Sequence, residues 1–471
     1  MPLQILSADH VSKILHSFTK DGILELQATL ADALHWYSTS EDGIDCCSDY
    51  QPERTALKRK DGSTTLYLPA SGITGQGVKV LNILPPDNAG FPALSETASD
   101  GDSRSSISSG DRNASIASTQ SERSSTSSVP TSVTKVTDST GNLSLTSKPD
   151  PDQSAVSTIK GSLTLLDNVG NTVGLINAEE VTAFRTALAS TMLLKKRHSV
   201  HDLTIFGAGK QAYWHARLAL LLRGDEIHHL NIVTRNFDSA RKCVMRLYNP
   251  QPDDPNYINH IGTKYNSKTK TSILTPSHTE YGRLLKEYVR ASNVIFCTTP
   301  STTPLFPGSY LTNPEGRKKG RYIACIGSYK SHMIELDPTI LQYAVAPHHE
   351  HRHIHKRQKE GGAILVDTVS GCLKNAGEVV QAKLMPDQVV ELGELFMLKR
   401  DAERRAAERG EKVDVGKDGC QLQENSGLKE WLTRGNVIYK SVGLGLMDIV
   451  VGNELLRVGK EKNIGLTVEN F

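Results

Sequence analysis

The stretch LTIFGAGKQAYWHARLALLL at residues 203–222 decides the fold. A short apolar run enters Gly207-Ala208-Gly209, and a helix-like apolar pattern follows, which predicts a strand, a tight turn and a helix. Further short apolar runs, separated by helical stretches, are HLNIVTR, NVIFCTT, YIACIGS and AILVD, beginning at residues 229, 293, 322 and 363. Buried strands that alternate with helices are typical of a doubly wound parallel sheet, so residues 199–436 are expected to form a Rossmann-type α/β domain.

The residues around this domain are expected to form a second, discontinuous α+β domain from residues 1–95, 158–198 and 437–471. TTLYLPAS and GQGVKVLNILP predict two strands, and GSLTLLDNVGNTVGLI predicts a hairpin that turns at residues 168–171. From residue 178 the period becomes helical; the residues that share one face are Val181, Phe184, Leu188 and Met192. The tail from Val437 has a helical pattern and is expected to pack outside the parallel sheet.

Residues 96–157 differ sharply in composition from both flanks. They are rich in Ser, Thr and Asp and contain no aromatic residue. Such a segment buries too little apolar surface to offset the entropy of ordering, so it is predicted to be a disordered insertion at a loop tip. A tolerated insertion and a segment regulated by phosphorylation are both compatible with this composition.

The totals exclude several classes. A formal net charge of +2, from 54 basic and 52 acidic residues, gives no reason to expect nucleic acid as a partner. Seven cysteines without a Cys-x-x-Cys pair argue against a disulfide framework or a zinc ribbon. The N-terminus is a poor signal peptide and no apolar run is long enough to span a membrane, so a cytoplasmic protein is expected.

The glycine turn has the spacing G-x-G-x-x-A from Gly207 to Ala212, between a predicted strand and a predicted helix. In a dinucleotide site the first glycine permits the tight turn, and the second lets the backbone approach a pyrophosphate. The helix N-terminus then offers N–H groups to the phosphates. A purely structural turn is the alternative.

The second predicted strand ends in Thr234-Arg235-Asn236 and carries no carboxylate there. Sites that prefer NAD place Asp or Glu at this point to hold the ribose 2′-hydroxyl. Arg235 could instead pair with a 2′-phosphate, which favours NADP(H) and leaves NAD(H) open. An arginine stacked on the adenine or simply solvated is the alternative.

Several segments together resemble the ornithine cyclodeaminase/mu-crystallin family. They are PERTAL, GVKVLNILP, VTAFRTALAS, the glycine turn, CTTPSTTPLF, IGSYKSHMIELD, LVDTVSGCLKNAGEV and YKSVGLGLMD. The resemblance covers most of the chain outside its insertions. It implies a substrate and dimerisation domain around a nucleotide-binding domain, a homodimer, and action on amino or imino acids with a nicotinamide cofactor.

Carried over residue by residue, the resemblance implies that Arg54 and Lys79 face the substrate and that Arg185 lies where substrate and cofactor meet. The residues implied to hold the dinucleotide are Arg185, Gly207, Gly209, Gln211, Thr234, Arg235 and Asn236. Those implied to line its nicotinamide side are Thr298, Thr299, Ser328, Asp367 and Ser441. A guanidinium fork suits a carboxylate, and a lysine beside it can move a proton. An edge-strand lysine with a snorkelling stem is the alternative for Lys79.

One departure matters for the reaction. Cyclodeaminases of the family carry a catalytic Asp two residues after the glycine that matches Gly327, and this chain has Tyr329 there. Reduction of an imino acid, such as a cyclic ketimine carboxylate, or hydride transfer with an α-amino acid is therefore expected, and an ornithine cyclodeaminase-like ammonia-lyase is the alternative. A non-catalytic, crystallin-like nucleotide binder is the second class, although such a protein has no need for Arg54, Lys79 and Arg185 together.

Two further patterns are expected to be structural. PHHEHRHIHK carries five histidines between His348 and His355 and is predicted to be a solvated loop, so no metal site is expected. Cys297 and Cys325 lie in predicted strands and are expected to be small core residues.

Overall fold

The structure, a computed structural model, describes residues 2–39, 51–52, 54–83, 159–250, 259, 261, 268–346, 363–412, 419–423 and 426–471. The predicted Ser-rich insertion (96–157) and the histidine-rich stretch (348–355) lie outside the described residues.

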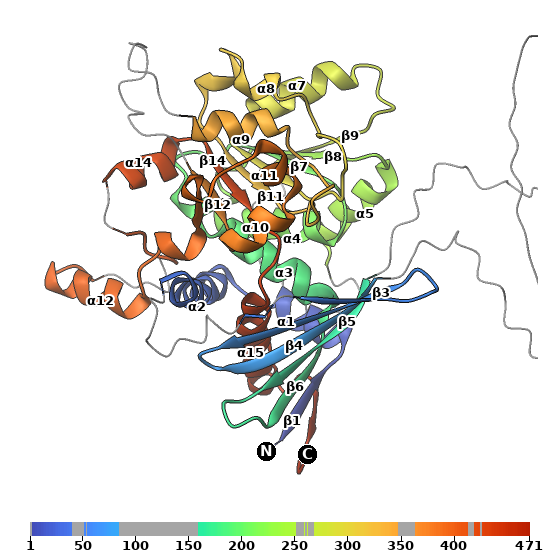
Figure 1. Cartoon of the computed structure of the whole chain (residues 1–471), viewed down its shortest axis with the longest axis vertical. Helices are drawn as coiled ribbons and strands as arrows, with labels where there is room; N and C mark the ends of the chain where they lie inside the picture. Colours follow the sequence, from blue (N-terminus) through green and yellow to red (C-terminus); the bar gives the residue numbers. More distant parts are fainter. Residues whose placement is uncertain are drawn as a thin grey trace, which may run out of the picture. The chain divides into compact units, whose positions relative to one another are not determined.

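Eight strands form one sheet in the order β13-β12-β14-β11-β10-β7-β8-β9 (Figure 1). Their bounds are β7 Asp202–Phe206, β8 His229–Val233, β9 Lys270–Leu274, β10 Val294–Cys297, β11 Tyr322–Cys325, β12 Ile364–Val366, β13 Val389–Glu391 and β14 Val437–Lys440. Each neighbouring pair is parallel. The strand order reverses between β7 and β10, the place where open α/β sheets bind ligands.

Both faces of this sheet are covered, as the continuous apolar runs predict. Val294 and Phe296 belong to one hydrophobic core, and Ile295 and Cys297 belong to another on the opposite face. The helices that accompany the sheet are α4 (Lys210–Arg223), α5 (Phe237–Tyr248), α7 (Tyr281–Ala291), α8 (Ser309–Thr312), α9 (Pro338–Val345), α10 (Val369–Asn375), α11 (Gly377–Ala382) and α14 (Ser426–Arg434). α12 (Lys399–Glu408) packs against α2 (Lys20–Thr39) instead. The predicted Rossmann-type architecture is thus present.

Seven strands form a second, mixed sheet in the order β15-β1-β6-β5-β4-β3-β2. Their bounds are β1 Leu3–Leu6, β2 Thr55–Lys58, β3 Thr64–Gly72, β4 Gly75–Ile83, β5 Ile159–Leu166, β6 Thr172–Asn177 and β15 Leu466–Val468. The expected hairpin joins β5 to β6, and Ile83 at the end of β4 lies opposite Ile159 at the start of β5. The long Ser-rich stretch therefore connects two adjacent strands of one sheet.

Four helices complete this part: α1 (Ala8–His16), α2 (Lys20–Thr39), α3 (Ala178–Thr191) and α15 (Gly445–Glu461). α15 packs on β3, β4 and β5, and the small residues Gly77 and Gly174 let its side chains approach the strands closely. α3 packs against β5 on one side and α4 on the other, so it links the two sheets (Figure 1). The four residues predicted to share its apolar face are all buried.

The expectation that residues 437–471 pack outside the parallel sheet is wrong for Val437–Lys440. These residues form β14, which lies between β11 and β12 in that sheet. Four residues give too little periodicity to stand out beside the long helical pattern of α15, and a lysine within the strand masks its burial. No helix among the described residues is long and apolar enough to cross a membrane.

Candidate active site

The glycine turn at the end of β7 has the geometry of a dinucleotide cradle. Gly207 has φ +110°, and a Cβ there would lie 2.6 Å from Thr298 Oγ1, so the position demands glycine. Gly209 precedes the first residue of α4, and a Cβ built on it would meet only open space. The Gln211 side-chain oxygen is buried and has no hydrogen-bond donor among the described residues. These features fit a pyrophosphate at the N-terminus of α4.

At the end of β8 the three predicted residues are placed differently. The Thr234 backbone N–H donates to the Leu274 carbonyl, and the Asn236 side chain accepts from Ser239 N at 2.9 Å, which caps α5. Arg235 is exposed and forms no hydrogen bond or ion pair with other described residues. Its guanidinium is thus available at the point where the sequence predicts the adenosine ribose.

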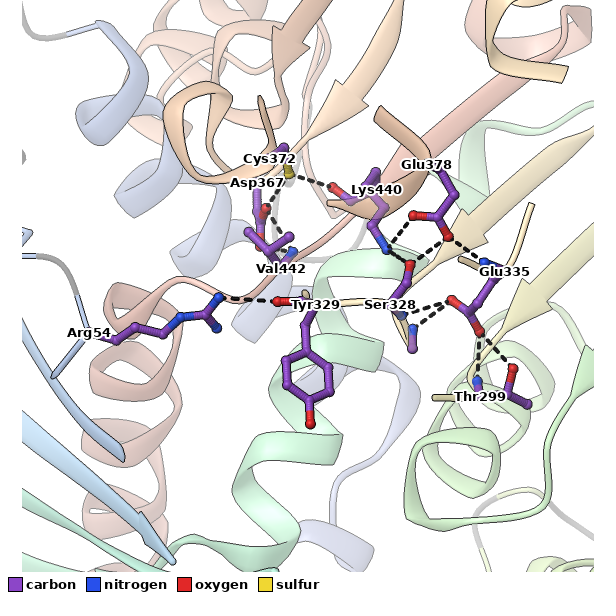
Figure 2. Close-up of polar contacts among 11 residues, drawn as sticks. Arg54, Thr299, Ser328, Tyr329, Glu335, Asp367, Cys372, Glu378, Lys440 and Val442 are labelled. Atoms are coloured by element: carbon purple, nitrogen blue, oxygen red, sulfur yellow. Dashed lines mark hydrogen bonds and ion pairs between the residues drawn. The ribbon is translucent and has the colours of Figure 1, made fainter. Parts of the chain in front are cut away.

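The loops after β10 and β11 are held by side chains that the sequence assigned to the cofactor. Thr298 Oγ1 donates to the Phe206 carbonyl at 2.7 Å, and Thr299 Oγ1 donates to Glu335 at 3.2 Å. Ser328 is fully buried and donates to Glu378 at 2.5 Å (Figure 2). These three hydroxyls bind neighbouring protein groups and thereby hold the two loops in place.

Asp367 and Ser441 likewise shape the backbone at the edge of the sheet. The Asp367 carboxylate accepts from Ser441 Oγ at 2.7 Å and from Gly443 N at 2.6 Å. This fixes the turn after β14, in which Gly443 has φ +93° and lies so close to Arg185 that a Cβ would be 2.8 Å from Nη2. Asp367 therefore positions the turn against which the Arg185 guanidinium rests.

Lys79 and Arg185 meet on one carboxylate, Asp448. Lys79 Nζ lies 2.5 Å from Asp448 Oδ2, and Arg185 Nε lies 3.4 Å from Asp448 Oδ1. The three side chains are 1 to 6% exposed. Since β4 is flanked by β3 and β5, Lys79 is not a snorkelling edge-strand lysine.

The charges of this trio do not cancel. Two cations and one carboxylate leave a single positive charge in a buried site, which favours an anionic ligand. Arg185 Nη1 reaches only the Met447 thioether, at 3.6 Å, and Nη2 donates to no described residue. Most N–H donors of this guanidinium therefore have no oxygen acceptor among the described residues, and a carboxylate would supply one.

Lys79 also has the acidity that a proton donor needs at neutral pH. Its pKa is lowered to about 8, mainly by burial and to a smaller extent by Arg185, although Asp448 opposes the shift by stabilising the ammonium. A lysine whose pKa lies near the working pH holds a proton and can also release it.

Arg54 also contacts a loop of the parallel-sheet domain. Its Nη2 donates to the Tyr329 carbonyl at 3.2 Å, in the loop after β11 (Figure 2). Arg54 and Arg185 thus contact the turns that follow β11 and β14, which are neighbouring strands. No contact joins Arg54 to Lys79 among the described residues.

Four charged residues of this region are not among the residues predicted from the sequence: Asp448, Glu335, Glu378 and Lys440. Asp448 lies 369 positions from Lys79, within an apolar helix pattern, so only the fold reveals the pair. Glu335 and Glu378 occur within segments that carry the family resemblance, and an acid inside an apolar motif was the available signal.

The chain is similar to several known proteins, although no family model matches it. It is 27% identical over 303 residues to the uncharacterized protein YGL159W of Saccharomyces cerevisiae, covering 61% of this chain and 70% of that protein. It is 23% identical over 291 residues to Delta(1)-pyrroline-2-carboxylate reductase of Colwellia psychrerythraea, covering 61% and 69%.

Solved structures share its fold. Delta(1)-pyrroline-2-carboxylate reductase of Thermococcus litoralis, in complex with NADH and L-proline, superposes with a TM-score of 0.57 at 16% identity, covering 99% of this chain and all of that one. A lysine cyclodeaminase superposes with a TM-score of 0.56 at 12% identity, covering 99% and 95%. The pyrroline-2-carboxylate reductase and the cyclodeaminase among these proteins support the resemblance to the ornithine cyclodeaminase/mu-crystallin family. The fold that these structures share with the chain is of the Rossmann type, and the Thermococcus litoralis enzyme was solved with NADH.

Proposed function

We propose that this protein is an NAD(P)H-dependent reductase of the ornithine cyclodeaminase/mu-crystallin type that reduces a cyclic ketimine carboxylate, such as Delta(1)-pyrroline-2-carboxylate. The observation that carries the proposal is the buried Lys79–Asp448–Arg185 trio, with its one uncompensated positive charge. The similarity to pyrroline-2-carboxylate reductases supports the choice of substrate.

Each side chain has a task in this reaction. Arg185, with Arg54 across the site, binds the substrate carboxylate through charge-assisted hydrogen bonds. Lys79 holds a proton for the imine nitrogen, because a protonated imine accepts a hydride more readily. Asp448 orients the ammonium and keeps it charged. A bound nicotinamide supplies the hydride.

Cyclodeamination demands more than this site offers. It needs a proton acceptor and donor at the α-carbon after the first oxidation, the role that the resemblance gives to an aspartate where this chain has Tyr329. A tyrosine hydroxyl lacks the carboxylate that serves as general base in this role. We therefore propose imine reduction without ammonia release from ornithine.

For the cofactor we propose NADPH over NADH. Arg235 is an exposed, unpaired cation among the described residues at the end of β8, and no carboxylate stands beside it to hold a 2′-hydroxyl. A guanidinium can bind a 2′-phosphate in a bidentate manner.

We further propose that the protein is a homodimer that uses the outer face of the seven-stranded sheet. α15 covers the inner face, whereas an apolar row on the opposite face stays partly exposed. The strand register places in this row Val78, Leu175, Ile5 and Leu466, with one polar residue, Thr164, between Val78 and Leu175. An exposed apolar sheet face is a typical interface between copies.

The decisive experiment is turnover by the purified protein. NADPH and NADH oxidation should be followed with pyrroline- and piperideine-2-carboxylate, with α-keto acids plus amines, and with ornithine plus NAD⁺ or NADP⁺. We expect oxidation of NADPH with a cyclic ketimine and no ammonia from ornithine. Ammonia released efficiently from ornithine would refute the proposal.

A further inference from the structure

One buried carboxylate, that of Glu335, bridges the two loops at the carboxyl ends of β10 and β11 (Figure 2). Its Oε1 accepts from the backbone N–H of Thr299 at 2.6 Å, and its Oε2 accepts from that of Gly327 at 2.7 Å and from Ser328 N at 3.3 Å. The loops themselves touch, since a Cβ on Gly327 would lie 2.0 Å from the Thr299 carbonyl oxygen. A change at Glu335 is therefore felt by both loops at once.

A second carboxylate and a lysine lock Glu335 in place. Glu378 Oε1 accepts from Glu335 N at 2.7 Å, and Glu378 Oε2 lies 3.5 Å from Lys440 Nζ. Lys440 Nζ also donates to Ser328 Oγ at 2.5 Å. Three ionisable side chains from the segment before α9, from α11 and from β14 thus converge behind the loops, and all three residues are at most 1% exposed.

Such a cluster is a poor way to gain stability. Two carboxylates face one ammonium, so one negative charge remains in a site without water access. Well-packed apolar side chains of similar volume are often as stabilising as a buried ionic group, or more so. What the carboxylate provides and an apolar group cannot is acceptors for backbone N–H groups of two separate loops.

We infer that Glu335 is a positioning residue, whose carboxylate clamps the loops at residues 298–299 and 327–328 in the arrangement that holds the nicotinamide end of the cofactor. The identity of the ligand in this inference rests on the proposed function. Its location follows from the fold, since both loops border the edge of the sheet where the glycine turn lies. Gly207 and Thr298 are in direct proximity there.

The charge state of the clamp supports this role. Burial raises the pKa of Glu335 to about 7; Lys440 from β14 opposes this shift, and Glu378 from α11 adds to it. The thiols of Cys297 and Cys325 on the adjoining strands also face the cluster. When Glu335 is protonated, one of its two oxygens carries a hydrogen and becomes a donor. The carboxyl group then no longer offers a full acceptor to each of the two loops. The clamp is therefore complete only in the ionised form.

Glu335→Gln should therefore impair function without lowering stability. Because the folded-state pKa of Glu335 is raised, its ionised form destabilises the fold as pH rises through about 7. Gln removes that charge, so the melting temperature at about pH 8.5 should not fall. The amide, however, presents an N–H to one of the loop N–H groups, so one loop is released.

The matched control is Asp337→Asn. Asp337 lies two residues away and also accepts backbone N–H groups, but from Gly308 and Thr339, at 3.1 and 3.0 Å. Amide hydrogen exchange of the full-length protein at about pH 8.5 should show faster exchange at Thr299 and Gly327 in Glu335→Gln, and at Gly308 in Asp337→Asn. Exchange in the two loops of Glu335→Gln that matches wild type would overturn the clamp.

The functional arm follows NADPH and NADH binding by titration and kcat/KM for pyrroline-2-carboxylate. We expect Glu335→Gln to lower kcat/KM by about 10- to 100-fold, and Asp337→Asn to leave it near wild type. A melting temperature and kcat/KM that fall together, with dinucleotide affinity unchanged, would show a merely structural role and overturn the inference. Failure of the proposed function would give a different result, in which wild-type protein binds dinucleotide without reducing the ketimine. The hydrogen-exchange and dinucleotide-titration measurements would still test the role of Glu335.

Discussion

Lys79 is the residue whose ionisation should govern the rate of imine reduction. Its pKa is lowered to about 8 by burial, so the ammonium needed for proton donation is lost as pH rises through that value. We expect kcat/KM for the ketimine to be level below about pH 8 and to fall above it. Oxidation of proline is the reverse reaction and needs Lys79 as a neutral amine that accepts a proton. The rate of proline oxidation should therefore rise as pH increases through the same value.

Asp448 sets where this transition occurs, because its carboxylate favours the charged lysine. In Asp448→Asn that support is gone, and the transition should move to lower pH. Lys79→Met keeps the stem but removes the amine, and should lower kcat by about 10²- to 10⁴-fold while dinucleotide binding survives. pH–rate profiles of the three proteins test this; an unchanged profile in Asp448→Asn would contradict the assignment of the transition to Lys79.

Arg235 should decide between the two dinucleotides. Arg235→Ala is expected to weaken NADPH binding by about 1–3 kcal/mol, the size of a lost charge-assisted hydrogen bond, and to leave NADH nearly unchanged. Isothermal titration of both cofactors against wild type and variant measures the difference. Equal affinities for NADPH and NADH in the wild type would contradict the binding of a 2′-phosphate by Arg235.

The strand–turn–helix element around Gly207 should tolerate no side chain. Gly207→Ala forces an alanine to φ +110° and against Thr298, which we expect to cost at least about 1–2 kcal/mol and to abolish dinucleotide binding. Gly282→Ala in α7 is the control, because its Cβ would meet nothing within 4 Å. It should be neutral or slightly stabilising in thermal unfolding. Normal cofactor binding by Gly207→Ala would remove the turn from the site.

At this scale the sequence predicts well where one signal dominates. The strands β10 and β11 are fully apolar runs, and β7 and β8 are mostly apolar and buried, so the positions of all four follow from burial on both faces. β14 was missed because its four residues adjoin the longer pattern of α15. Short strands inside a sheet are specified by their neighbours, which the linear sequence does not contain.

The site was predictable only in part for the same reason. Arg54, Lys79 and Arg185 stand in motifs that carry the family resemblance, so the chain itself marks them. Asp448 gains meaning only when α15 folds onto β4 and brings it to Lys79. Ser328 is a converse case, since its motif indicates a cofactor contact, whereas the fold turns its hydroxyl toward Glu378.

For the molecule as a whole, the open sheet face is the feature that a single chain leaves unexplained. Lys79, Leu163 and Ile176 point to the inner face and are buried, whereas the row through Val78 and Leu175 points outward. Leu175 is 38% exposed and Leu466 is 59% exposed. Burial of such a row against a second copy would remove apolar surface from water on both chains.

Leu175→Lys should therefore produce a monomer. A charge in the centre of the proposed interface would face its own copy across a twofold axis, and burying it there without a partner is costly. Val169→Lys is the matched control, because Val169 is 84% exposed in the β5–β6 turn and lies outside the row. Sedimentation equilibrium of wild type and both variants measures the mass. We expect dimers for wild type and for Val169→Lys, and a folded monomer for Leu175→Lys. A dimeric Leu175→Lys variant would show that the interface lies elsewhere.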